Sequence, residues 1–473
     1  MDICKEIRNG KPSQELIRIV TSAVGETRNI TGPAVDHSSA EYMKISPDTE
    51  IYTDKSILIK LIFDYKDSEH DRLLPHYIKL KQYKDDISRI GFRRKVPSRY
   101  DVEKILTDFI YTHGYYHDEK ENRQIRAVPE IFKGNEGIEK ELDEHKLIMM
   151  EYIVGNSLGR LVKDYENKIE DMSASNPHYK LIEDKIIDIL GSAVYTLALF
   201  HVTSAKYEIE IKEKIKKEGE QELTRITPNL YTIMTMNYLE HIIKQRNIKD
   251  YKNYKEAIGL AVNTISPYQD PKNNNLVTII HGDPHLLNFI KSEQDTKLVD
   301  CGHVKIGLQE QDIAYMLVNT IVHRPFDAVK RLMCKYLDKR KSLESKLGFD
   351  QKYEIDKEQF CQNFLLFSLG GLIKMAGTTA YTLMYKPVDI QLLDIGYRSG
   401  VERNMSKLHG MVEIIKDSSI SRDIKAAVSN LDNILIRELG LDQPAPASYN
   451  KQTAFFKQAT RMGKKIKSEL GMA

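Results

Sequence analysis

The sequence predicts an α+β fold with two lobes, a small β-rich N-terminal lobe and a large, mainly helical C-terminal lobe. Before about residue 155, short runs of β-branched and apolar residues are separated by turn-forming residues. After that point, longer stretches repeat their apolar residues with the period of about 3.6 residues that is typical of helices. One short β-rich segment, at 276–302, interrupts the helical part. The expected division is therefore 1–154 for the first lobe, 155–442 for the second and 443–473 for a basic tail.

The composition of the chain is that of a folded globular protein. Its 473 residues are enough for two or three lobes, 41% of them are apolar, and a formal net charge of +2 gives no strong signal for nucleic-acid binding. The start of the chain lacks an apolar signal-peptide core, and none of the four cysteines forms a CxxC pair. The most apolar later stretch, 364–385, is interrupted by Lys374 and several glycines. We therefore expect a reduced, cytoplasmic protein without a transmembrane segment, in which 364–385 is a buried core helix.

Each element of the first lobe has its own local signal. The runs EYMKI and SILIKLIF are short, apolar and β-branched, and a turn-rich stretch joins them, so both are predicted as strands. Pro97 and Ser98 precede a periodic stretch and predict the start of a helix. The expected elements are, in order, a short amphipathic helix at 14–23, strands at 41–45 and 56–63, a helix from 98 to about 111, and a buried strand at 145–153 that ends in a linker near Gly155.

The second lobe is predicted to be helical except around residue 280. The stretch 184–201 has a strong helical period, two similar stretches follow it, and the chain after Gln311 reads as helices separated by polar turns. The runs LVTII and TKLVD are predicted as two strands of one hairpin. The ends of these strands would place Asp283, Asn288 and Asp300 at one rim.

The spacing of these three side chains suits a divalent cation and a proton acceptor. Asp283 lies in the segment HGDPHLLN five residues before Asn288, and Asp300 follows twelve residues later. Carboxylate and amide oxygens are the ligands that Mg²⁺ prefers, and phosphoryl transfer uses Mg²⁺ together with a carboxylate that accepts the proton of the attacking hydroxyl. The alternative is a polar turn without a function. His281 is expected to be a structural residue that is hydrogen-bonded within the loop.

The segment HGDPHLLNFI, followed by LVDCG, resembles the catalytic loop and metal-binding segment of the aminoglycoside phosphotransferase and choline kinase families. These families are small-molecule relatives of the protein kinases. The resemblance therefore implies a bilobal protein-kinase-like fold and a kinase that moves the γ-phosphate of ATP to a hydroxyl of a small molecule, such as an aminoglycoside, a sugar or an amino alcohol. It implies Asp283 as the catalytic base, Asn288 and Asp300 as Mg²⁺ ligands, and ATP and Mg²⁺ as cofactors. Asp312 would hold the catalytic loop by hydrogen bonds.

A kinase of this type also needs a strand lysine that orients the phosphates of ATP. Lys60, in the run ILIKLIF, is expected to be this residue, because a lysine between apolar strand residues needs an anion to offset its desolvation. Glu103, in the helix that begins near residue 98, is expected to pair with Lys60. Asp101 and Asp108 are alternative partners, and the alternative for Lys60 is an edge-strand lysine that faces water.

Two further segments resemble nucleotide-binding parts of these families. The stretch TGPAVDHSSAEYMKI has no GxGxxG motif but is similar to the serine-rich loop of some aminoglycoside phosphotransferases, which implies backbone contacts with phosphate at Ser38 and Ser39. The stretch LIMMEYIVGNSL resembles the hinge between the lobes. This resemblance implies that the carbonyl of Glu151 and the amide of Ile153 bind the edge of the adenine.

The sequence leaves other functions open. An atypical protein Ser/Thr kinase shares this type of loop, and a nucleotide-binding regulatory protein with a kinase-like fold would tolerate the missing glycine loop. The sequence does not determine the identity of the hydroxylated acceptor, the choice between ATP and GTP, or the oligomeric state. The basic tail at 451–467 is expected to be a solvated or packed helix, and the alternative is a contact with nucleic acid or an anionic membrane.

Overall fold

The structure is a computed structural model in which the chain forms two units built from interleaved segments. The first unit comprises Met1–Thr224, Leu286–Val304 and Lys339–Phe349, and the second comprises Arg225–His285, Lys305–Asp338 and Asp350–Ala473. The residues described are 41–44, 54–67, 70–83, 98–119, 122–169, 172, 176–218, 222–226, 228–245, 277–321, 326–349 and 357–385, with a few between 15 and 23 and between 411 and 429. Ser38, Ser39 and the tail at 451–467 lie outside them, as does the side chain of Lys60. Gly155 lies inside the first unit.

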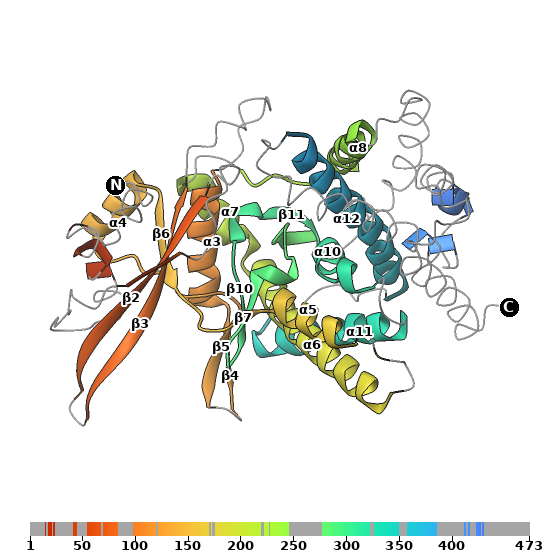
Figure 1. The fold of residues 1–473 in the computed structure, drawn as a ribbon. Coiled ribbons are helices and arrows are strands. Elements are labelled where there is room, and N and C mark those ends of the chain that lie inside the picture. The colour runs from red at the N-terminus through yellow and green to blue at the C-terminus, as the bar shows by residue number, and fades with distance from the viewer. Residues whose placement is uncertain are drawn as a thin grey trace. The chain divides into compact units, whose positions relative to one another are not determined.

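The first unit contains a four-stranded antiparallel sheet in the order β1-β2-β3-β6, of which β2, β3 and β6 are labelled in Figure 1. Its strands are β1 (Glu41–Lys44), β2 (Asp54–Asp67), β3 (His70–Tyr83) and β6 (Leu147–Glu151). The predicted strands at 41–45, 56–63 and 145–153 are confirmed. Leu80 of β3 and Met149 of β6 lie opposite each other and are both buried, which anchors these two strands in the core.

Strand β3 is not among the strands predicted from the sequence. Its first half contains charged residues and Pro75, which are rare inside strands. Its second half, YIKLKQY, does alternate apolar and polar residues with the period of two that is typical of a strand. This alternation predicts that both lysines of the run lie on a solvent-exposed face, but Lys81 is only 4% exposed. Its burial therefore comes from contacts that are distant in the sequence.

Helix α3 (Arg99–His113) begins where the sequence predicts. Ser98 is the N-cap, and its hydroxyl accepts a hydrogen bond from the amide of Asp101. Helix α3 contacts α6 and α7, and its apolar residues Leu106 and Ile110 are fully buried. The other helices and strands of this part of the first unit are β4 (Tyr115–Asp118), β5 (Arg123–Arg126), α4 (Glu136–Glu144), β7 (Asn156–Ser157), α5 (Leu158–Ile169), α6 (Pro177–Lys206) and α7 (Glu208–Glu218).

Among the described residues, one helix, α6, is long and apolar enough to cross a membrane. The most apolar part of this 30-residue helix has a mean hydropathy of 1.6, and 72% of that part is buried inside the structure. Leu190, Leu197 and Phe200 are fully buried. This degree of burial is typical of a core helix.

The predicted hairpin of LVTII and TKLVD is wrong. Strand β8 (Val277–Ile280) pairs with β11 (Lys305–Leu308) in the second unit, whereas β10 (Thr296–Leu298) pairs with β9 (Phe289–Lys291) in the first. A turn at 292–295 closes the β9–β10 hairpin, with the amide of Ser292 donating to the carbonyl of Asp295 at 2.9 Å. Strands of three or four residues carry too little periodic pattern to be recognised in the sequence. Asp283 and Asp300 therefore follow strands of two different sheets.

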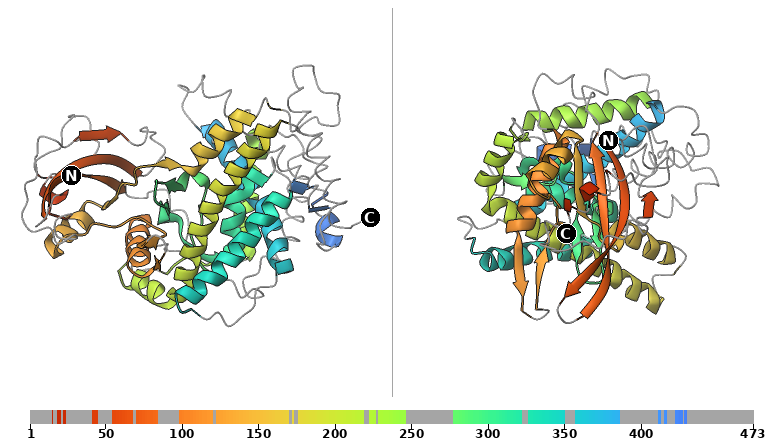
Figure 2. Two further views of the ribbon diagram at one scale, coloured as in Figure 1. Left: turned by 90° about the horizontal axis from the view of Figure 1, so that it is seen from below. Right: turned by 90° about the vertical axis from the view of Figure 1, so that its left-hand side faces the viewer.

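The second unit is mainly helical. Helix α12 (Lys357–Tyr385) packs against α8 (Pro228–Gln245) and α10 (Gln309–Ile321), and α8 and α12 are seen side by side in Figures 1 and 2. Helix α11 (Phe326–Lys346) contributes its last residues to the first unit. The predicted core helix is confirmed within α12, because Phe364 and Leu372 are fully buried. The predicted α+β class is also confirmed.

Candidate active site

A buried lysine of β3 joins two carboxylates in the first unit. Lys81 Nζ donates to Glu103 Oε2 at 2.7 Å and to Asp300 Oδ1 at 2.8 Å. The side chains of Lys81 and Glu103 are 5% and 2% exposed, whereas that of Asp300 is 29% exposed. A charge that is buried this deeply needs hydrogen-bonded counter-charges. The ammonium and the two carboxylates therefore form one interdependent cluster.

Aromatic and small residues position this cluster. Lys81 Nζ lies 4.8 Å from the centre of the Tyr83 ring, which packs edge-on against Tyr100 of α3. At Gly302, an added Cβ would lie 3.2 Å from the Tyr83 hydroxyl and 3.3 Å from Arg99 Nε. Gly302 therefore allows α3 and the end of β3 to approach the chain just after Asp300.

Glu103 is the acid of α3 that meets a buried lysine. The carboxylate of Asp101 accepts a hydrogen bond from the Ser98 hydroxyl at the start of the helix. Asp108 pairs with Lys133 at 2.6 Å. Asp101 and Asp108, the two alternatives from the sequence, thus have other partners, and Glu103 is the acid of this helix that reaches the cluster.

The sequence predicts that Lys60 pairs with Glu103, but the lysine that contacts Glu103 in the structure is Lys81. Lys60 lies on β2, with Tyr77 opposite it on β3, four residues before Lys81. The side chain of Lys60 is outside the described residues. The signal that could have found Lys81 is the alternating run YIKLKQY, which sits one strand closer to β6.

Asp300 has the charge and conformation of a candidate cation ligand. Asp300 lies directly before the 3₁₀ turn η6 (Cys301–His303) and adopts a left-handed backbone conformation (φ 66°, ψ 52°). This conformation is strained for a residue other than glycine. Burial opposes ionisation, but the positive charges of Lys81 and Arg99 outweigh it and hold the pKa of Asp300 far below its ordinary value. Lys81 and Arg99 both contact Oδ1, at 2.8 and 3.6 Å.

The lowered pKa of Asp300 links the stability of the fold to pH. A carboxyl group whose pKa falls on folding stabilises the folded chain above its unfolded pKa of about 3.9, and this contribution is lost as the pH falls below that value. Between about pH 5 and pH 8 the carboxylate of Asp300 therefore stays ionised and available to a cation.

Asn288 lies next to Asp300 at the end of one hairpin. Phe289 of β9 pairs with Leu298 of β10, and the amide of Val299 donates to the carbonyl of Asn288 at 2.9 Å. An amide oxygen and an ionised carboxylate are oxygen donors that fit Mg²⁺. The described residues contain no cluster of three or more His, Cys, Asp or Glu side chains that could hold a metal.

In the second unit, Asp312 holds the loop that carries Asp283. Its carboxylate accepts hydrogen bonds from the amide of His281 at 2.6 Å and from the amide of Gly282 at 2.9 Å. His281 is fully buried, and its Nδ1 accepts from the amide of Asp283 at 3.4 Å. Gly282 has a φ of 79°, a conformation that favours glycine. The predictions that Asp312 holds this loop and that His281 is a structural residue within it are confirmed.

Replacing Asp312 by alanine is expected to lower the free energy of unfolding by about 3 kcal/mol, because one buried and one partly buried amide would lose a charged acceptor. Chemical denaturation gives this value, and amide hydrogen exchange should be faster at His281 and Gly282. The control is Asp338→Ala, at an exposed position of α11, which should stay within about 0.5 kcal/mol of wild type. Equal stability of the two variants would contradict the role of Asp312.

Lys374 of α12 contacts Asp283, a contact that the sequence pattern does not predict. Its Nζ donates to Asp283 Oδ1 at 3.1 Å and lies 4.1 Å from the centre of the Tyr315 ring. Burial opposes its charge, but Tyr315 and Asp283 outweigh burial and raise the pKa of Lys374 above its ordinary value. Burial raises the pKa of Tyr315 to about 12, so its hydroxyl stays protonated. The sequence signal that could have identified Lys374 is its place as a lone lysine within an apolar helix. A charge that is buried in such a helix needs a partner of opposite charge.

Glu151 and Ile153 lie where β6 leaves the sheet of the first unit. The amide of Glu151 donates to the carbonyl of Glu130 at 2.9 Å, and its carboxylate pairs with Lys297 at 2.7 Å. Ile153 is buried. Their contact with a nucleotide stays a prediction.

The sequence matches no protein-family model and no curated protein. The chain is similar to the solved structure of a choline kinase from Cryptosporidium parvum Iowa II, at 11% identity and a TM-score of 0.47 over 89% of this chain and 99% of that one. It is similar to a Plasmodium vivax ethanolamine kinase, at 13% identity and a TM-score of 0.45 over 84% and 89% of the two chains. It is also similar to the solved structure of an amicoumacin kinase, at 11% identity and a TM-score of 0.41 over 84% of this chain and 96% of that one. The solved structures that this chain resembles here are thus named as kinases of choline, ethanolamine and amicoumacin.

Proposed function

We propose that the chain is a phosphotransferase that moves the γ-phosphate of ATP to a hydroxyl of a small molecule. The observation that carries this proposal is the buried Lys81, which bridges Glu103 and Asp300. In protein kinases, a lysine of a β-strand pairs with a helix glutamate and orients the phosphates, and an aspartate of a separate segment holds Mg²⁺. The three residues of this cluster are of the same types and lie on the same kinds of element.

On the nucleotide side, Lys81 orients the phosphates of ATP, in the role that the sequence analysis gives to Lys60. Glu103 holds the Lys81 ammonium in place. The carbonyl of Glu151 and the amide of Ile153 bind the edge of the adenine, and the backbone at residues 38 and 39 contacts phosphate.

On the acceptor side, Asp283 takes the proton of the attacking hydroxyl. The proton passes to its carboxylate as the hydroxyl oxygen bonds to the γ-phosphorus and the bond from that phosphorus to the departing ADP oxygen breaks. Asp312 fixes the loop through the two amides that precede Asp283, and Lys374 holds one carboxylate oxygen. The acid is therefore positioned before the acceptor binds.

Asn288 and Asp300 would hold Mg²⁺, which supplies positive charge against the phosphate oxygens when it is bound. The low pKa of Asp300, which keeps its carboxylate ionised, supports this assignment.

Replacing Asp300 by asparagine is expected to raise the Mg²⁺ concentration for half-maximal phosphate transfer by at least about tenfold, because loss of even an indirect ligand contact costs that much. The measurement is a Mg²⁺ titration of transfer at saturating ATP. Glu293→Gln removes one exposed carboxylate from the turn of the same hairpin and should leave the titration unchanged. An identical Mg²⁺ dependence in Asp300→Asn and wild type would remove Asp300 from the metal site.

The proposed function is tested by phosphate transfer from ATP, with Mg²⁺, to a panel of amino sugars, amino alcohols and other hydroxylated metabolites. We expect transfer to at least one of these small molecules. Transfer to casein-like peptides alone would favour the protein kinase alternative. Binding of ATP with no turnover over hours would favour the regulatory alternative.

A further inference from the structure

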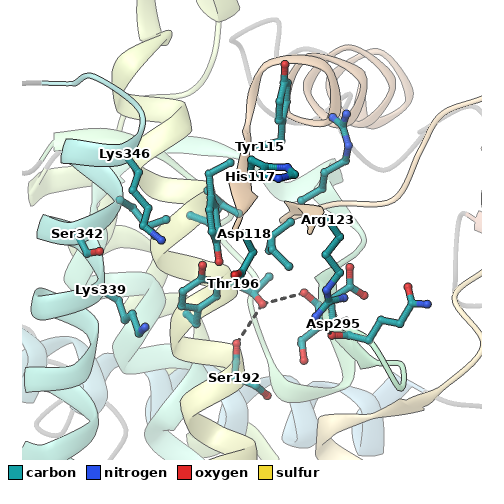
Figure 3. A pocket seen from close by; sticks show the side chains of 18 of the residues that line it. Tyr115, His117, Asp118, Arg123, Ser192, Thr196, Asp295, Lys339, Ser342 and Lys346 are labelled. Carbon is teal, nitrogen blue, oxygen red and sulfur yellow. Dashed lines mark hydrogen bonds between the residues drawn. The ribbon is translucent and has the colours of Figure 1, made fainter. Parts of the chain in front are cut away.

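A cavity of about 960 Å³ lies in the first unit, and none of the residues of the candidate active site lines it. Its walls come from the β4–β5 hairpin, helix α6, the turn between β9 and β10, and the end of helix α11 (Figure 3). Small-molecule sites typically have volumes of roughly 300–1,000 Å³. The cavity is therefore large enough for a metabolite or a nucleotide.

Positive charge predominates in the lining of this cavity. The basic residues are Arg123, Arg126, Lys291, Lys339 and Lys346, and the acidic residues are Asp118, Glu119 and Asp295. Arg126 donates to the carbonyl of Tyr111 and to Gln124 Oε1, whereas Arg123 donates to the carbonyl of Gln294 at 2.5 Å and its buried Nε has no hydrogen-bond partner among the described residues. The positive charges available to a ligand are therefore those of the lysines and of Arg123.

Two of these lysines lie on one face of α11 and have no carboxylate partner among the described residues. Lys339 and Lys346 are seven residues apart, and Ser342 lies between them on the same face. Lys339 Nζ lies 5.0 Å from the centre of the Tyr195 ring, and Lys346 Nζ lies 4.5 Å from that of Tyr116. The two rings pack edge to face, 6.1 Å apart. The ammonium groups are therefore held next to an aromatic pair and not next to an anion.

Hydroxyl groups complete the lining. The Thr296 side chain is buried, and its Oγ1 has no hydrogen-bond partner among the described residues, whereas the Thr196 hydroxyl is bonded to backbone carbonyls (Figure 3). A buried hydroxyl without a partner is costly and is explained by a bound ligand or water. Burial, assisted by Asp118, raises the pKa of Tyr116 to about 12, so its hydroxyl stays protonated and able to donate.

We propose that this cavity binds a small molecule that carries a phosphate group. The phosphate lies near Lys339, Ser342 and Lys346, and the rest of the molecule packs on the tyrosine pair. Lysine acts as a compact point charge and is a common ligand of phosphate groups in proteins. This inference does not depend on the proposed phosphotransfer.

The absence of tryptophan from the sequence makes a local test possible. Tyr195→Trp introduces a single tryptophan into the cavity, and inorganic pyrophosphate and phenyl phosphate serve as probes. We expect a saturable change in its emission. The matched control is Tyr165→Trp on α5, because lysines also approach that ring, at 4.8 and 6.0 Å, but it does not line the cavity. Its emission should not change.

The lysines are tested in the Tyr195→Trp chain and by calorimetry in the chain with natural tyrosines. Lys339→Gln/Lys346→Gln should raise the Kd of pyrophosphate at least tenfold. Lys335→Gln/Lys341→Gln removes the same charge from exposed positions of α11 outside the cavity and should leave the Kd unchanged. Phosphate transfer from ATP should be unchanged in both pairs, which separates this inference from the proposed function.

Three results would overturn the inference. The first is the absence of a saturable signal at residue 195 with either probe. The second is an equal loss of affinity in the two lysine pairs, since this would show a general charge effect. The third is an equal response to citrate, which would exclude selectivity for phosphate.

Discussion

Replacing Asp283 by alanine is expected to reduce phosphate transfer by about 100- to 10,000-fold, the range that general acid–base catalysis contributes. The affinity for MgATP should stay near that of wild type, because the proposed nucleotide contacts are made by Lys81, Glu151 and Ile153. Single-turnover transfer and equilibrium binding of ATP measure the two quantities separately.

Two further variants make the Asp283 result specific. Leu287→Ala changes an exposed residue of the same loop and should transfer phosphate at close to the wild-type rate. Lys374→Met removes the ammonium that contacts Asp283 and should lower kcat less than the loss of the acid itself. If Asp283→Ala transfers phosphate as fast as wild type, Asp283 is not the base.

Replacing Lys81 by methionine is expected to abolish ATP binding and to lower the free energy of unfolding by about 3–5 kcal/mol. The loss of stability follows because removing one partner of a buried ion pair leaves the other charge buried without compensation. Glu103 is 2% exposed and cannot be rehydrated without opening the contact between β3 and α3. Denaturant unfolding and ATP binding, each measured on the full chain, check the two effects.

The same experiment decides between the two candidate lysines. Lys60→Met is the matched variant, one strand away in the same sheet, and we expect it to retain ATP binding. Adding Glu103→Gln to Lys81→Met should restore part of the lost stability, since the uncompensated carboxylate is then neutral, without restoring ATP binding. A larger loss of ATP binding in Lys60→Met than in Lys81→Met would return the role to Lys60.

Local signals in the sequence predict much of this fold correctly. The Ser98 cap is a contact between residues three positions apart, and β6 is a continuous buried apolar run, so each can be recognised within a short window. The hydrogen bonds that Asp312 accepts from the amides before Asp283 follow the motif that the sequence displays. The short strands β9 and β11 could not be predicted, because three or four residues do not establish a period.

The sequence alone determined the α+β class and the loop before Asp283 that Asp312 holds, and it left Asp101 and Asp108 as alternatives to Glu103. Tertiary structure decided which lysine Glu103 meets, that Lys374 contacts Asp283, and that lysines of α11 line a cavity with tyrosines of β4 and α6. The physical reason is distance along the chain. Lys81 meets residues 22 and 219 positions away, and Lys374 meets one 91 positions away. Such contacts depend on strand register and helix packing, which no short window of sequence contains.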